Sequence, residues 1–308
     1  MTNPILFSKS SSFVAQSFAR FCVINHKFKF TLMKKSLILV CAVAMFSACG
    51  SHKKGTEPQT GTKSLVLYYS QTGTTKKVAE LISQKTGADI EAIDAVNPYD
   101  GDYDQTIARG KQEMEDNILP DINPLQSRIE DYDTVYLGFP VWFGTYAPPM
   151  GRLIKDTDFA GKVLIPFCTF GSGGLESSVA NLKAAQPNST VLEGFGIRAA
   201  RMDAASAELD QFLMRLGILP GTAAPLPQYG TPAPVTAEEK ALFDEACGDY
   251  PMPLGTPVSV AKADGQDCTY YCFTTDSKNP DGESMSFKIY VVKPAADGSK
   301  AEFTKVVR

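Results

Sequence analysis

Histidine is almost absent from this chain. Its 308 residues include only two, and only His52 lies beyond the first 48 residues. Nucleophilic catalysis of the Ser–His–Asp or Cys–His type needs an imidazole base, and most zinc hydrolase sites need imidazole ligands. The seven cysteines include no pair of C-x-x-C motifs with the spacing of a metal site. Any chemistry must therefore come from carboxylates, lysines, hydroxyls or a bound cofactor.

The chain also lacks a long apolar run. The run from Leu37 to Phe46 is too short to be a transmembrane helix. Because Met33-Lys34-Lys35 precedes it and small residues follow, the pattern predicts an export signal over 33–48. Cys49 follows Ser-Ala as the lipidated cysteine does in a bacterial lipobox, which it resembles. We therefore expect an exported lipoprotein held at a membrane through Cys49; a plain membrane anchor or a secreted protein cleaved nearby are the alternatives.

Two further segments flank this signal. Residues 1–32 contain no acidic residue and precede a better start at Met33, so we interpret them as an upstream mis-start. Residues 49–62, rich in Gly, Ser, Thr and Lys, predict a flexible tether.

Positive charge is scarce once the signal is removed. Residues 1–48 hold six Lys and Arg and no Asp or Glu, so the remainder has 24 basic and 34 acidic residues. Its net charge is −10, against −4 for the whole chain. Nucleic-acid binding needs clustered cations, so we expect no nucleic-acid partner.

The body of the chain alternates apolar strands with amphipathic helices. We expect strands at 64–69, 89–93, 134–139, 162–168 and 190–197, and helices at 76–86, 103–117, 148–155, 174–185 and 203–216. Apolar strands that alternate with helices indicate a parallel sheet covered on both faces. The sequence therefore predicts an α/β fold with a five-stranded, doubly wound parallel sheet in one domain, residues 63–219.

The turn after the first strand is rich in hydroxyl groups. It comprises Ser70, Gln71, Thr72, Gly73, Thr74 and Thr75 and leads directly into a helix. A helix N-terminus offers unpaired N–H groups and the positive end of its dipole, and Gly73 permits close approach of a ligand to the backbone. The pattern indicates a phosphate site, although Thr72 and Thr75 are also typical helix caps.

Two more strand ends carry unusual loops. The second loop contains Pro140, Val141, Trp142, Phe143 and Gly144, and the third contains Thr169, Phe170, Gly171 and Gly173. Ligands of doubly wound sheets bind at the carboxyl ends of the strands, where the three loops should converge. Aromatic side chains there suit a flat heterocycle.

The motifs S-x-T-G-x-T, P-x-W-x-G-T and F-C-T-x-G-x-G stand in these loops in this order. In them the chain resembles the flavodoxin family, in particular a bacterial branch of flavodoxin-like proteins. The resemblance implies FMN as cofactor, with its phosphate held by hydroxyls and amides of the first loop. It also implies that Trp142 or Phe143 flanks the isoalloxazine, that Gly144 lies near its N5 edge, and that Phe170 and the following amides line the pyrimidine or ribityl side.

Three functions remain open on this reading. The first is electron transfer through the bound flavin, with a redox protein or a quinone-like acceptor as partner; it needs no catalytic side chain. The second is an NAD(P)H-dependent quinone or flavin reductase. The third is a cofactor-free surface lipoprotein that serves as a binding scaffold.

The remainder of the chain is of a different kind. Residues 220–235, dense in Pro, Gly, Ala and Thr, predict a linker, and 236–308 predict a short helix followed by a small β-meander of unknown role. In an oxidising compartment we expect a disulfide of Cys247 with Cys268 or Cys272, with free buried thiols as the alternative.

Overall fold

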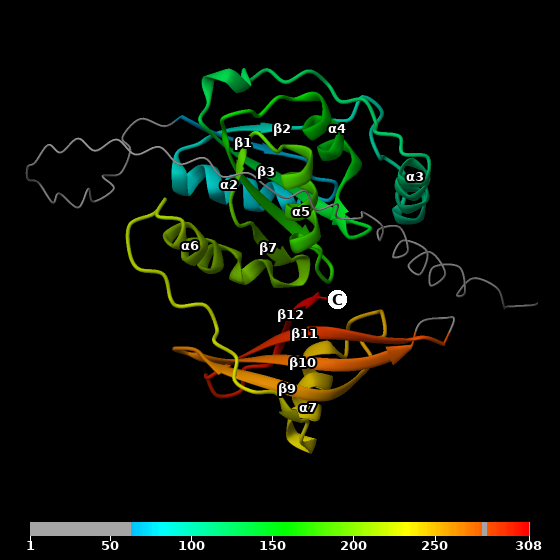
Figure 1. Ribbon diagram of the computed structural model, residues 1–308, viewed down its shortest axis with the longest axis vertical. Coiled ribbons are helices and arrows are strands. Elements are labelled where there is room, and N and C mark those ends of the chain that lie inside the picture. The colour runs from blue at the N-terminus through cyan, green and yellow to red at the C-terminus, as the bar shows by residue number, and fades with distance from the viewer. Residues whose placement is uncertain (1–62, 279–281, 308) are drawn as a thin grey trace, which may run out of the picture. The chain divides into compact units, whose positions relative to one another are not determined.

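The computed structural model describes residues 63–278 and 282–307 (Figure 1). The predicted mis-start, export signal, lipidated Cys49 and tether lie outside the described residues. Within the part that is described, no helix is long and apolar enough to cross a membrane. Among the described residues, contacts join 63–277 and 286–307 into one compact unit.

A parallel sheet forms the first part of this unit. Its strands follow the order β2 (Asp89–Ala92), β1 (Ser64–Tyr68), β3 (Thr134–Trp142), β5 (Val163–Phe170), and then β6 (Thr190–Val191) and β7 (Phe195–Arg198), which both pair with β5. All of these pairs are parallel. A short β4 (Thr145–Tyr146) turns back antiparallel on the end of β3.

The predicted strand 190–197 is two strands, not one. Leu192 N–H donates to the Leu164 carbonyl of β5, so position 166 of β5 presents its backbone to the same neighbour. Pro166 has no N–H to give, which interrupts the ladder between β6 and β7. A Cβ at Gly194 would lie 3.1 Å from the Pro166 carbonyl oxygen, so the chain also passes close to β5 here.

Helices cover both faces of the sheet, as predicted. On one face α2 (Thr74–Thr86) and α6 (Ala205–Arg215) bury apolar side chains against β1, β3 and β5. On the other face α4 (Pro148–Asp156) and α5 (Leu175–Ala185) do the same. α3 (Tyr103–Glu115) begins at a capping box made by Asp102 and Gln105. Two 3₁₀ turns, η2 (Ile129–Asp131) and η3 (Ala199–Ala204), precede β3 and α6.

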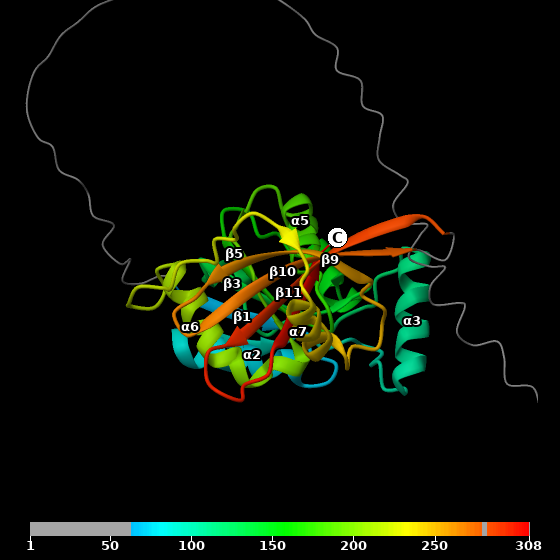
Figure 2. The same ribbon diagram turned by 90° about the horizontal axis from the view of Figure 1, so that it is seen from below.

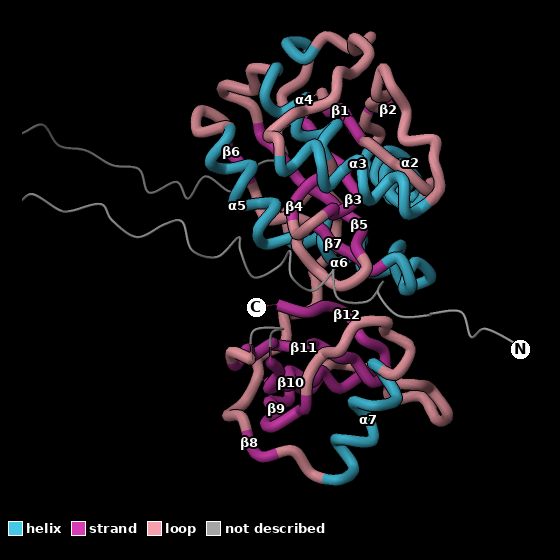
Figure 3. Tube along the Cα trace, turned by 90° about the vertical axis from the view of Figure 1, so that its right-hand side faces the viewer, coloured by secondary structure: helices cyan, strands magenta, loops and turns pink. Residues whose placement is uncertain are grey.

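The second part is an antiparallel meander, also as predicted (Figures 2 and 3). Its strands lie in the order β12 (Glu302–Val307), β11 (Ser284–Pro294), β10 (Cys268–Lys278), β9 (Thr256–Asp264) and β8 (Ala233–Pro234). α7 (Ala237–Cys247) packs on it, with the rings of Phe243 and Phe273 5.2 Å apart. β8 lies inside the predicted linker and pairs with β9.

The predicted disulfide is not formed. The four cysteines among the described residues, Cys168, Cys247, Cys268 and Cys272, are all free. Cys247 belongs to the cluster that α7 makes with Phe273. Because side chains alternate along β10, Cys268 and Cys272 face away from the side that Phe273 occupies, so the sheet separates them from Cys247.

Candidate functional site

The three loops converge at one edge of the sheet. β1, β3 and β5 are parallel neighbours, so their carboxyl ends lie together. The hydroxyls of Thr75 and Thr169 are 2.8 Å apart and connect the first loop to the third. The Ser177 hydroxyl, one turn into α5, donates to the Gly144 carbonyl and so connects the third loop to the second.

The first loop is built to receive an anion. Gly73 adopts a left-handed φ of +84°, and α2 begins directly after it without a side-chain cap or an acidic residue in the first turn. Ser70 Oγ accepts from Lys76 N at 3.1 Å, which folds the loop back over the helix end. The hydroxyls of Thr72 and Thr74 lie 3.3 Å apart at the surface. The helix dipole and these hydroxyls therefore act on the same point.

Two predicted ligand contacts in this loop have other partners. The Gln71 amide accepts from the Tyr69 hydroxyl and donates to the Tyr99 carbonyl, both at 2.5 Å. The Thr75 side chain is buried against Thr169. Both side chains brace the loop, whereas the hydroxyls of Ser70, Thr72 and Thr74 make their hydrogen bonds at the exposed surface.

The second loop has a fixed aromatic side chain. Trp142 makes edge-to-face contacts with Tyr69 and Tyr99, at centroid distances of 6.1 and 5.1 Å. Gly110 of α3 backs this contact, since a Cβ there would lie 3.3 Å from atoms of both Trp142 and Phe143. Phe143 follows with φ +51° and Gly144 with φ +83°, two consecutive left-handed residues that turn the chain sharply before β4.

Sequence reasoning missed Tyr99, which lies in the loop before α3. Its hydroxyl donates to Glu113 at 2.5 Å, and the Arg109 guanidinium lies 3.8 Å from its ring centroid. Burial, then the hydrogen bond to Glu113, raises the pKa of Tyr99 far above its usual value, so it stays protonated. No periodicity marks this loop position, and only the fold brings Tyr99 against Trp142.

The third loop is held from outside the sheet. Arg198 of β7 donates to the Gly171 carbonyl at 2.7 Å and to the Phe303 carbonyl of β12 at 2.9 Å. Val306 N–H of β12 donates to the Ser172 carbonyl at 2.7 Å, and a Cβ at Gly173 would collide with the Val306 carbonyl. No pattern in the sequence indicates that Arg198 and β12 contact this loop.

Phe170 is a buried residue at the end of β5. It is 6% exposed and belongs to the core cluster of the α4 and α5 face. It also lines a cavity that the other residues of the three loops do not line.

The strand order and the three loops define a doubly wound α/β protein whose first loop leads into the N-terminus of α2. Residues 63–210 match the family model described as Flavodoxin, and this part of the chain belongs to the flavodoxin family. No curated protein matches the chain.

Solved structures of similar proteins include two from Bacteroides. A candidate flavoprotein from Bacteroides eggerthii is 31% identical, with 48% of this chain and 96% of that chain covered and a TM-score of 0.43. One from Bacteroides uniformis is 28% identical, with 49% and 99% covered and a TM-score of 0.44. A flavoprotein from Lactobacillus acidophilus, solved in complex with FMN, is 24% identical, with 49% and 97% covered and a TM-score of 0.41.

Proposed function

We propose that this protein binds FMN at the three loops and acts in electron transfer through the bound flavin. The observation that carries the proposal is the N-terminus of α2, where Gly73 provides no side-chain cap and the hydroxyls of Ser70, Thr72 and Thr74 gather at the edge where the Trp142 loop also ends. Membership of the flavodoxin family supports the same cofactor.

The residues present fit this group. The first-turn N–H groups of α2 and the hydroxyls of Ser70, Thr72 and Thr74 would hold the phosphate. The turn at Phe143 and Gly144 and the backbone of 171–174 would meet the ring system, with Trp142 or Phe143 against it. FMN, when bound, supplies the electron-accepting and electron-donating chemistry.

The side chains at this site suit a carrier. Gln71, Thr75 and Tyr99 are all engaged in hydrogen bonds that hold the loops in place. Such groups bind, orient and exclude water around a cofactor, and they transfer no proton themselves. We further propose that lipid on Cys49 holds the protein at a membrane outside the cytoplasm, where a redox protein or a quinone-like acceptor would be its partner.

The phosphate contact can be tested with two flavins. Thr72→Val with Thr74→Val removes two hydroxyls, and hydrogen bonds to charged groups contribute about 1.5–3 kcal/mol each. We expect FMN to bind roughly 100-fold more weakly to this variant, while riboflavin, which lacks the phosphate, binds as to the unchanged protein. Fluorescence titration gives both affinities, and Thr256→Val, at an exposed threonine of β9, is the matched control.

Three results would count against the proposal. If the protein stays colourless after incubation with FMN, it binds no flavin, and this result would favour the cofactor-free scaffold. An equal loss of riboflavin affinity in the variant would place the effect outside the phosphate site. Rapid oxidation of NADPH with a quinone acceptor and no partner protein would identify a reductase instead of a carrier.

A further inference from the structure

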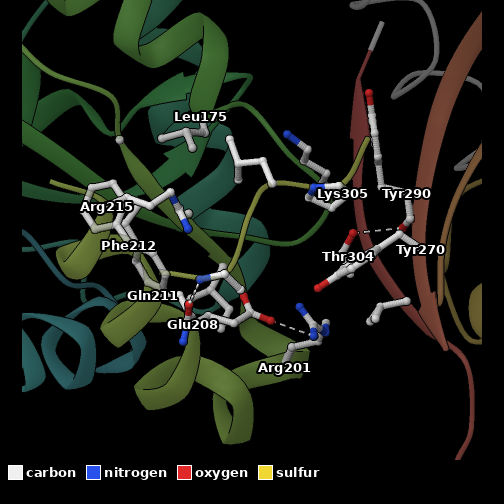
Figure 4. A pocket seen from close by; sticks show the side chains of 18 of the residues that line it. Leu175, Arg201, Glu208, Gln211, Phe212, Arg215, Tyr270, Tyr290, Thr304 and Lys305 are labelled. Atoms are coloured by element: carbon white, nitrogen blue, oxygen red, sulfur yellow. Dashed lines mark hydrogen bonds and ion pairs between the residues drawn. The ribbon is translucent and has the colours of Figure 1, made fainter. Parts of the chain in front are cut away.

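A cavity of about 450 Å³ touches the three loops at Phe170 and extends away from them (Figure 4). Its walls come from β7, α6, the segment 224–229 and one face of the C-terminal sheet. Small-molecule sites have volumes of about 300–1,000 Å³ and combine apolar and aromatic walls with a few polar groups. The size of this cavity fits that class, so the chemistry of its walls decides what it could hold.

One wall is aromatic. Tyr270 of β10 and Tyr290 of β11 project from the sheet, and Tyr229 packs on Tyr290 with ring centroids 5.9 Å apart at 68°. Burial raises the pKa of Tyr290 to about 12, so its ring stays neutral. Exposed edges and faces of tyrosine rings attract a planar aromatic ligand, because ring pairs prefer edge-to-face and offset-stacked contacts.

The opposite wall is a face of α6. Glu208, Gln211, Phe212 and Arg215 recur at three- and four-residue spacing, which places them on one side of the helix. Gln211 uses its carbonyl oxygen to accept from Ala224 N at 2.7 Å, so its amide N–H groups remain for a ligand. Figure 4 shows these side chains on the side of the cavity opposite Tyr270 and Tyr290.

The cationic side chains that line the cavity differ in how closely an acidic side chain contacts them. Arg201 contacts Glu208 at 2.8 Å and Glu302 at 2.7 Å, and Lys305 contacts Glu176 at 2.5 Å. Arg215 has Glu193 at 3.7 Å and lies 5.9 Å from the Phe212 ring centroid, and it makes no hydrogen bond to any of the described residues. Its guanidinium is therefore the cation of this wall that is available to a ligand.

We propose that this cavity binds a planar aromatic carboxylate, with the ring against the tyrosines and the carboxylate on Arg215. A guanidinium binds a carboxylate through two parallel hydrogen bonds. A single available cation matches one negative charge, and the carboxylate of Glu208 on the same wall disfavours a doubly charged phosphate group. The site is independent of the flavin, because the residues that hold the ligand lie outside the three loops.

Calorimetric titration with two naphthalene probes tests this. 2-Naphthoate carries the carboxylate, and 2-naphthamide is its neutral counterpart of the same shape. We expect naphthoate to bind the full chain at least about tenfold more tightly than naphthamide, since losing a hydrogen bond to a charged group costs about that factor. Arg215→Met should abolish the difference, and Arg128→Met, at an exposed arginine outside the cavity, should preserve it.

A second variant addresses the aromatic wall. Tyr229→Leu should weaken both probes equally, because it removes a ring and no charge. The proposal is overturned if the unchanged protein binds neither probe, if Arg215→Met keeps the preference for naphthoate, or if FMN displaces naphthoate competitively. Naphthoate binding to a protein that takes up no FMN would sustain this site while the proposed flavin function fails.

Discussion

The hydroxyl pair of Thr75 and Thr169 allows a strict test of how the first and third loops are joined. The two side chains are 1% and 5% exposed, and their oxygens are 2.8 Å apart. Replacing either residue with valine preserves its shape but leaves the other hydroxyl buried without a partner. Such a group costs about 1–3 kcal/mol, whereas replacing both partners by apolar groups of the same shape is nearly neutral.

The expected pattern is therefore non-additive. Thr75→Val and Thr169→Val should each lower the free energy of unfolding by about 1–3 kcal/mol, and the double variant should lose less than the sum of the two. Urea denaturation followed by circular dichroism measures all four proteins, with Thr256→Val as the control for a surface threonine. Additive losses, or single losses no larger than that of the control, would refute this account of the pair.

Three other expected outcomes concern charge and reactivity. Arg201→Met should lower the free energy of unfolding by about 1–3 kcal/mol, because its side chain is only 11% exposed beside Glu302; thermal denaturation that is unchanged would contradict this. The hydrogen bond from Lys262 lowers the pKa of Glu239, so this pair stabilises the fold above the ordinary value of 4.5 and the benefit is lost as the pH falls through the lowered pKa. Glu239→Gln should therefore flatten the acid side of the stability–pH curve, and an unchanged curve would rule this out. Burial raises the pKa of the Cys247 thiol to about 12, so it should react with a disulfide reagent only after denaturation; labelling of the native protein at the rate of an exposed thiol would show otherwise.

The parts of the fold that depend on local pattern could be predicted from the sequence. Apolar strands that alternate with amphipathic helices indicated the parallel sheet, and turn residues such as Asp264-Gly265 separated the strands of the meander. The convergence of the three loops also followed, because parallel strands place their carboxyl ends together.

The features that the sequence analysis missed or predicted wrongly depend on contacts between distant segments. The break between β6 and β7 arises from Pro166 on the neighbouring strand, which the sequence of 190–197 cannot reveal. The brace at Tyr99 and the bonds of Arg198 join residues that no spacing rule connects. The cysteine pairing failed for a similar reason, since strand alternation places Cys272 and Cys247 on opposite faces of a sheet.

The contacts that β12 makes with β7 and α5 have a consequence for folding kinetics. Arg198 and Phe303 are 105 residues apart in sequence, and Glu176 and Lys305 are 129 apart. Closing such long loops costs more chain entropy than forming local helices and hairpins, so we expect these bonds to form after the folding transition state. Interactions absent from the transition state slow unfolding without speeding folding. The strand that holds the third loop would thus lengthen the lifetime of the native protein more than it hastens its formation.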